Sequence, residues 1–222
     1  MRLGNLAMSV CVSFWLCSAS AHAQSAPHLP TLAVEVTAGT FGVGPEVTYR
    51  VNRNIGLRAG ASFLKASRGI QSDGVQYQGD LKLGSWGAMV DLYPMSGHFR
   101  MSAGFRVNKG TRLNMTATPA GPTTIGNTTY TPAQIGNLSG TVRVSDIAPV
   151  LTIGWAGGLT KGVKLGFDAG AMLSGSPKMR DISASNSAIT AADINAQKDK
   201  INRELGKIAV YPVVQASLGY AF

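Results

Sequence analysis

A two-residue period of apolar side chains dominates the chain. From Pro212 to Phe222 every second residue is apolar, and most of the residues between them are small or polar. The same alternation occupies 55–63, 99–107, 147–155 and 163–173. Such a period is typical of a β-strand whose two faces meet different surroundings. The sequence therefore predicts an all-β chain.

The stretch 31–51 predicts two further strands. Alternate positions are apolar on each side of Gly39 and Gly42, so we place a tight turn there. One long bent strand is the alternative, and it would leave an odd number of strands, which is uncommon in antiparallel membrane barrels. With two strands in this stretch the count is about eight, the smallest size known for outer-membrane barrels.

The stretch 75–93 predicts another strand that changes phase along its length. Leu81 and Leu83 are out of phase with Val90. This indicates either a bulge near Ser85 or a strand that extends beyond the bilayer.

The predicted strands are joined by short and long connections in alternation. Short turns fall at 52–54, 94–97 and 157–162, and long polar segments fall at 66–76, 109–139 and 174–207. Outer-membrane barrels have short turns on the periplasmic side and long loops outside. The sequence therefore predicts an up-and-down antiparallel barrel with both termini at the periplasmic rim.

The last long connection also predicts a short helix. Thr190 and Asp193 have the spacing of a capping box, helix-forming residues follow, and Gly206 marks the end. Ile201 and Leu205 belong to a narrow apolar stripe. We expect a surface helix that packs across the barrel mouth, and a helix that binds a partner is the alternative.

Charged residues of both signs occupy the strand faces opposite the apolar ones, beginning with Glu35. A soluble barrel would have to bury these charges in its core, whereas in a membrane barrel they turn inward and pair with one another. The predicted fold is therefore an eight-stranded transmembrane β-barrel with a polar lumen. We expect a lumen ion-pair network made of Glu46, Arg50, Arg58, Asp91, Arg100, Arg106, Asp146, Lys164 and Asp168.

The first residues predict a signal peptide. A short apolar run ends in Ala21-His22-Ala23, which has the small-x-small pattern of a cleavage site. We expect residues 1–23 to be removed and residues 24–222 to form the barrel domain. A buried helix over 6–19 is the alternative.

Composition narrows the class of protein. Hydrophobic residues make up 45% of the chain, yet outside the first twenty or so residues no apolar run approaches the roughly 18 positions of a membrane helix. Both cysteines, Cys11 and Cys17, lie in the predicted signal peptide, so the mature chain has no disulfide or thiolate metal site. The net charge of +9 favours anionic lipid or lipopolysaccharide as a partner, while export argues against nucleic acid. We expect no metal and no cofactor.

The C-terminal segment carries a family resemblance. With Leu218, Tyr220 and Phe222 at alternate positions, it resembles the final-strand signature of bacterial outer-membrane proteins, which the barrel assembly machinery recognises. Gly42–Arg50 and Phe99–Gly104 are similar to segments of small outer-membrane β-barrels, broadly like outer membrane proteins A, X and W. The resemblance covers nearly all of the mature chain. It implies a Gram-negative outer membrane and the assembly machinery as a partner, but no activity, because the family shares architecture and not a catalytic site.

Three functions are compatible with these patterns. We expect a non-enzymatic barrel whose ion pairs fill the lumen and whose long loops interact with the surroundings, including an unknown loop ligand. A narrow channel for ions or small apolar molecules is the alternative. A lipopolysaccharide-modifying hydrolase would need a Ser-His-acid constellation, and the mature chain offers only His28 and His98.

Basic residues in the long connections are candidates for contact with lipopolysaccharide phosphates, and ordinary solvated charge is the alternative. They are Lys65, Arg68, Lys178, Arg180, Lys198, Lys200 and Arg203.

Overall fold

The structure is a computed structural model of the 222-residue chain, and it describes residues 31–222 apart from 73, 158–160 and 187. The predicted signal peptide and His28 lie outside the described residues.

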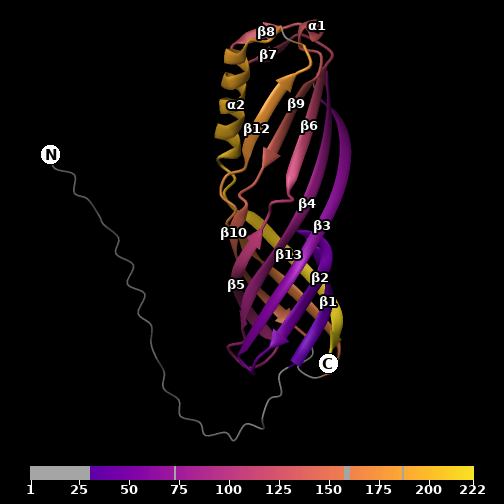
Figure 1. Cartoon of the computed structure of the whole chain (residues 1–222), viewed down its shortest axis with the longest axis vertical. Coiled ribbons are helices and arrows are strands. Elements are labelled where there is room, and N and C mark those ends of the chain that lie inside the picture. The colour runs from indigo at the N-terminus through magenta and orange to yellow at the C-terminus, as the bar shows by residue number, and fades with distance from the viewer. Residues whose placement is uncertain (1–30, 73, 158–160, 187) are drawn as a thin grey trace, which may run out of the picture.

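Eight antiparallel strands form a ring. Each is hydrogen-bonded to both of its neighbours, and β13 pairs with β1 (Figure 1). The prediction of eight antiparallel strands in one ring is confirmed. In order around the ring they are β1 (Thr31–Gly39), β2 (Gly42–Arg50), β3 (Ile55–Ser72), β4 (Val75–Leu92), β5 (Phe99–Val107), β10 (Ile147–Ala156), β11 (Gly162–Met172) and β13 (Tyr211–Ala221).

Two of the ring strands continue far beyond it. β3 and β4 have 18 residues each, whereas the other ring strands have 9 to 11. Their outer halves carry the same sheet beyond the ring as a part here called the extension sheet, with the order β3-β4-β6-β9-β12. Its further strands are β6 (Arg112–Pro119), β9 (Leu138–Arg143) and β12 (Lys178–Ala184).

Two helices and a small hairpin complete the extension. Helix α2 (Ala191–Leu205) runs beside β12, and the strands β7 (Thr123–Ile125) and β8 (Thr128–Tyr130) lie with the one-turn helix α1 (Pro132–Ile135) at the tip (Figure 1). Neither helix is long and apolar enough to cross a membrane, within the part of the chain that the structure describes.

The segments predicted as long polar connections contain further strands beside the predicted helix, so the chain has more strands than the eight that were predicted. Most of 66–76 belongs to the β3–β4 hairpin, whose register runs without a shift from Ile55 opposite Leu92 to Ser72 opposite Val75. The change of phase in β4 thus reflects a strand that leaves the ring and not a bulge. The sequence is polar there because one face of the outer hairpin meets water.

The predicted turn between the first two strands is confirmed. β1 ends at Gly39 and β2 begins at Gly42, whose φ of 105° lies in the region that favours glycine.

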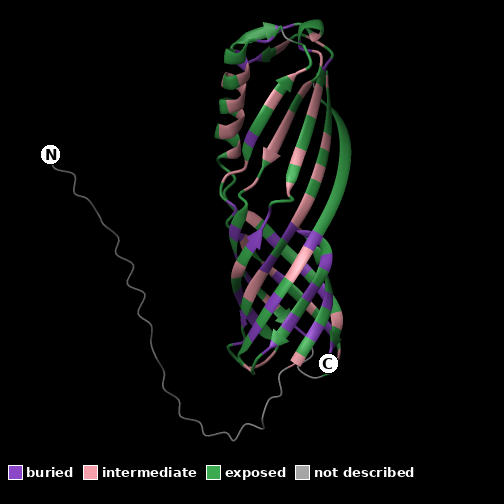
Figure 2. Cartoon of the chain, in the orientation of Figure 1, coloured by how far each residue is buried: buried purple, intermediate pink, exposed green. Residues whose placement is uncertain are grey.

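Apolar side chains point in opposite directions in the two parts of the molecule. On the ring they face outward: Leu57, Val90 and Leu151 are each about half exposed, and alternate residues are buried (Figure 2). In the extension sheet they face the covered side, where Leu81 and Leu83 line a cavity. The ring thus has the pattern of a membrane barrel, and the extension has that of a soluble sandwich.

Helix α2 begins and ends as predicted but lies elsewhere. The Thr190 hydroxyl accepts a hydrogen bond from the Asp193 backbone N–H, and Gly206 follows the last turn. Its apolar stripe packs on the extension sheet, so the helix stands along that sheet and does not cross the barrel mouth (Figure 1).

Candidate functional site

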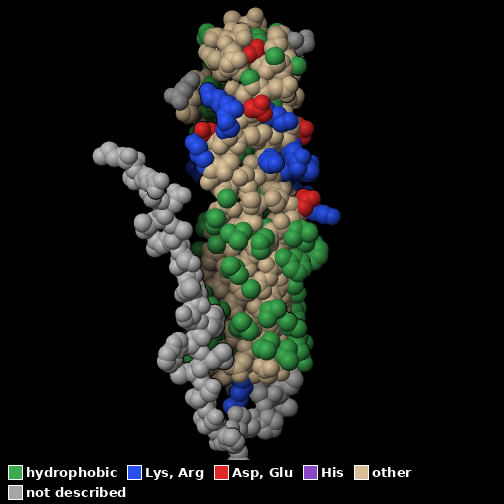
Figure 3. All heavy atoms as spheres, turned by 90° about the vertical axis from the view of Figure 1, so that its left-hand side faces the viewer, with side chains coloured by type: hydrophobic (Ala, Val, Ile, Leu, Met, Phe, Trp, Pro, Cys, Tyr) green, Lys and Arg blue, Asp and Glu red, His purple; other side chains and the backbone are tan. Residues whose placement is uncertain are grey.

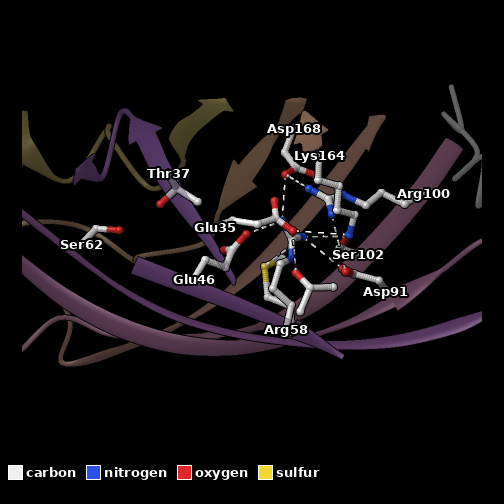
Figure 4. Close-up of polar contacts among 12 residues, drawn as sticks. Glu35, Thr37, Glu46, Arg58, Ser62, Asp91, Arg100, Ser102, Lys164 and Asp168 are labelled. Atoms are coloured by element: carbon white, nitrogen blue, oxygen red, sulfur yellow. Dashed lines mark hydrogen bonds and ion pairs between the residues drawn. The ribbon is translucent and has the colours of Figure 1, made fainter. Parts of the chain in front are cut away.

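Arg58 lies at the centre of a buried cluster inside the ring (Figure 4). It projects from β3, and its Nη1 donates to Asp168 Oδ2 at 2.8 Å, while Nη2 donates to Asp91 Oδ1 and to Ser102 Oγ, both at 3.0 Å. Glu46 Oε1 lies 3.5 Å from Nη1. One guanidinium therefore joins side chains from β11, β4, β5 and β2.

Arg100, on β5, forms the second centre of the same cluster. Its Nε and Nη2 donate to the two carboxylate oxygens of Asp168 at 2.9 and 2.5 Å, a bidentate arrangement, and its Nη1 lies 3.8 Å from Asp91 Oδ2. Bidentate Arg–carboxylate pairs are among the strongest hydrogen-bonded contacts in proteins. We call this set of five charged side chains the ionic layer: Glu46, Arg58, Asp91, Arg100 and Asp168.

The ionic layer is screened from solvent. Arg100 and Asp91 are 0% exposed, and Arg58 and Asp168 are 3% exposed. Ionised groups so far from water are tolerated only when they are paired and hydrogen-bonded, as these are. The side chains of alternate residues on five strands meet here because the strand period of two turns every second residue inward.

A second ion pair lies beside this layer. Lys164 Nζ, from β11, is 3.4 Å from Glu35 Oε1 on β1, and the Thr48 hydroxyl donates to the same oxygen at 3.2 Å. Glu35 was not among the predicted network residues, although its alternation with Val34 and Val36 places it on the polar face of β1. The two-residue period of β1 was therefore sufficient to predict Glu35 as a member of the network.

Arg50 and Arg106 lie away from the ionic layer. At the end of the ring where β1 begins, Arg50 Nη2 donates to the Arg53 carbonyl at 2.7 Å, and its guanidinium lies 3.7 Å from the centre of the Tyr93 ring. Towards the other end, Arg106 donates to Ser62 and Ser85 at 2.9 and 3.1 Å. Both are buried, and both are held by neutral groups.

Asp146 is the predicted network residue that the structure places outside the ring. It precedes β10 and its side chain is exposed. Its position in the alternation is that of an inward residue, but β10 begins one residue later, so no neighbouring strand wall encloses it. The three predicted assembly-signal residues, Leu218, Tyr220 and Phe222, are exposed on the outer face at the end of the chain.

An apolar layer follows the polar interior towards the extension. Its buried residues are Phe41, Ala148, Val150, Met172 and Val213, and the Phe41 ring lies 4.1 Å from the Arg106 guanidinium and stacks on Tyr211. The interior of the ring therefore consists of an ionic layer and then a hydrophobic plug on the side of the extension.

The extension encloses two apolar cavities in series beneath α2. The first, of about 260 Å³, lies next to the plug and is lined by Phe41, Leu83, Leu113 and Leu205 among others. The second, of about 200 Å³, lies towards the tip and is lined by Tyr77 and other apolar residues. Small apolar cavities of this kind are suited to hydrocarbon groups.

The described residues offer few groups for metal binding or acid–base catalysis. Among the described residues, no cluster of three or more His, Cys, Asp or Glu side chains could hold a metal ion. His98 is the one histidine in that part of the chain, and its Nδ1 lies 2.9 Å from the Ala156 carbonyl, with the ring beside Trp155. The carboxylates of the ring interior face guanidinium and ammonium groups.

Comparisons with known proteins find similar folds. No protein-family description and no curated protein sequence matches the chain. The crystal structure of Acinetobacter baumannii CarO2 is similar, with a TM-score of 0.61 and 19% identity over 87% of this chain and 99% of that one. Acinetobacter baumannii CarO has a TM-score of 0.58 and 19% identity, covering 86% and 97%. At this identity the likeness establishes the fold alone, and the resemblance to outer membrane proteins A, X and W stays a prediction.

Proposed function

We propose that this chain is a non-enzymatic outer-membrane β-barrel protein whose lumen is blocked by paired charges and whose extension is its surface for interaction. The observation that carries the proposal is the convergence of Arg58 and Arg100 on Asp168 inside the ring. A water-filled pore leaves such side chains solvated, whereas these are nearly inaccessible. In barrels of eight strands the interior is filled by side chains.

The outer surface of the ring supports the membrane location. Apolar side chains gather over the ring on the face that Figure 3 shows, while Lys and Arg side chains gather just above it. Ring strands of 9 to 11 residues, in the six strands that do not leave the ring, match the length that a tilted strand needs to cross a bilayer. Aromatic residues such as Trp155 and Tyr220, each about half exposed, are suited to the membrane interface.

The location is tested first by fractionation. We expect the chain in the outer-membrane fraction and, after extraction, a folded band whose gel migration changes on heating. Recovery as a soluble periplasmic monomer contradicts the proposal.

The blocked lumen is tested by planar-bilayer conductance of the purified protein. We expect no stable unitary steps, because the ionic layer and the apolar plug lie one after the other along the ring. Stable steps that vanish in Arg100→Gln would instead support the alternative, a narrow channel lined by the same charges.

A further inference from the structure

Five basic residues lie side by side across the outer face of the extension sheet. The pairing registers place Lys65 opposite Lys82, Lys82 opposite Arg112, Arg112 opposite Arg143, and Arg143 opposite Lys178. We call this set the cationic row. It crosses all five strands of the sheet, from β3 to β12, a width of about 19 Å at about 4.8 Å per strand.

All five side chains are exposed, and they share one face. The chain neighbours Leu83 of Lys82, Val142 of Arg143 and Met179 of Lys178 face the covered side, so the row faces outward. Arg112 is exposed on the same row and also borders the first cavity. Among the described residues, no member of the row forms a salt bridge. Two carboxylates, Asp80 and Asp181, lie in the neighbouring row of paired residues, which is nearer the tip of the extension.

Like charges directly opposite each other destabilise a sheet. One such pair is unremarkable, but four successive pairs in one row oppose folding at each strand junction. Because the row carries this cost and has no acidic partner within the described chain, an anion from outside is the group that would neutralise it.

The position of the row identifies the kind of anion. Phe63, two residues before Lys65 on β3, and Trp86 on β4 are 61% and 57% exposed and form the upper edge of the apolar belt. The cationic row therefore begins about 7 Å above that edge, at about 3.3 Å per residue. This is the level of lipid headgroups if the belt lies in hydrocarbon.

A groove joins the two surfaces. It has a volume of about 680 Å³ and is lined by Phe63, Trp86, Lys65, Lys82 and Lys109. Its apolar side chains suit an acyl chain, and its three ammonium groups suit phosphate.

We propose that the cationic row and this groove bind the phosphorylated, acylated lipid A part of lipopolysaccharide in the outer leaflet. The inference rests on the outer-membrane location proposed above. The phosphates lie against the row, and an acyl chain lies on Phe63 and Trp86. The extension sheet is thereby held at the membrane surface by its first row of residues.

The test is calorimetric titration of the folded protein in detergent micelles with lipid A that carries its phosphates. The row variant is Lys82→Gln with Arg112→Gln and Arg143→Gln. The matched control removes three charges from α2: Lys198→Gln, Lys200→Gln and Arg203→Gln. We expect the row variant to bind on the order of a hundredfold more weakly, at about fivefold for each cation, and the helix variant to bind within about twofold of wild type.

Two further ligands separate the sources of phosphate. Phosphatase-treated lipid A is expected to bind at least about tenfold more weakly to the wild type, and inorganic phosphate is expected to show no binding at the same concentration. Equal effects of the row and helix variants, equal binding of dephosphorylated lipid A, or binding of free phosphate as tight as that of lipid A would each overturn the inference.

Folding and location are read separately. The heat-modifiable gel band shows that each variant is folded, and if the triple variant lacks it, Arg112→Gln alone carries the test with an expected weakening of about fivefold. Fractionation of the wild type tests the membrane location itself. If the chain is found in the outer membrane but the row variant binds lipid A as tightly as the wild type, this inference is refuted and the proposed function stands.

Discussion

Asp168 is the carboxylate on which both buried guanidiniums converge, and Asp168→Asn is the sharpest perturbation of the ionic layer. The wild-type side chain accepts one hydrogen bond from Arg58 at 2.8 Å and two from Arg100 at 2.5 and 2.9 Å. Asparagine keeps the size of the side chain but removes its charge and turns one acceptor into a donor. Two guanidiniums then share the remaining carboxylates, Asp91 and Glu46.

The expected loss of stability follows from these contacts. Asparagine keeps one of the two acceptor oxygens, so one or two of the three charge-assisted bonds are lost, at about 1.5–3 kcal/mol each. Removing one partner of a buried ion pair costs about 3–5 kcal/mol in other proteins, which agrees with this range. Because Asp91 still holds Arg58 at 3.0 Å, we expect about 3 kcal/mol. That is a large share of the roughly 5–15 kcal/mol that stabilises a typical domain.

The assay is urea unfolding in phospholipid vesicles, followed by loss of the heat-modifiable gel band. The control is Glu204→Gln, which removes a carboxylate 2.7 Å from Lys207 Nζ in a pair whose side chains are 68% and 71% exposed. We expect this control to change the free energy of unfolding by no more than about 0.5 kcal/mol. An Asp168→Asn variant that unfolds at the same urea concentration as the control would refute the view that the ionic layer is a structural support.

Three further predictions concern other parts of the molecule. Hydrogen bonds from the Asn127 backbone N–H and the Tyr130 hydroxyl lower the pKa of Asp193 to about 2. The stability that the Asp193 carboxylate contributes is therefore complete above its ordinary pKa of 3.8 and is lost as the pH falls towards 2. We expect hydrogen exchange of α2 to be unchanged at pH 5 and faster below pH about 4. Ile201→Ala removes a half-buried contact between α2 and the extension sheet, and we expect a local cost of about 1–2 kcal/mol, seen as faster exchange across α2 with no change in the ring. Leu151→Lys places a charge on the outward face in the middle of β10, and the proposed membrane location predicts a cost of about 2–4 kcal/mol in vesicles. A lysine in place of an exposed extension residue such as Gln78 is expected to cost no more than about 0.5 kcal/mol, and equal costs would contradict the proposed location.

The ring could be predicted from the sequence because one local rule governs it. An outward apolar residue fixes the inward direction of its neighbours, so Arg58, Arg100 and Asp168 were identified as interior residues without knowledge of which strands pair. Which of them touch could not be predicted, because Arg58 and Asp168 are 110 positions apart and their contact depends on ring geometry. Asp146 shows the limit of the rule, since alternation says nothing about where a strand begins.

The extension could not be predicted, for a different physical reason. Its strands also alternate, but β6 pairs with β4 and β9 pairs with β6 and β12, so each pairing is set by the packing of distant segments. The cationic row depends on these registers: its members are separated by 17 to 35 positions in the chain, as at Lys65, Lys82, Arg143 and Lys178. The sequence identified Lys65 and Lys178 only as isolated loop charges.

The β3–β4 hairpin explains how one pair of strands serves both parts of the molecule. Along β4 the inward positions change from Asp91 to Leu83, and the outward positions change from Trp86 to Lys82, without any shift in register. A strand cannot exchange its faces without a bulge, so the surroundings must exchange instead. The proposed membrane location accounts for this exchange, since it puts an apolar medium outside the ring and water outside the extension. On the proposed location, the membrane ends at the level where both faces change, between Trp86 and Lys82. At the same level the paired charges inside give way to the apolar plug, and the cationic row appears outside.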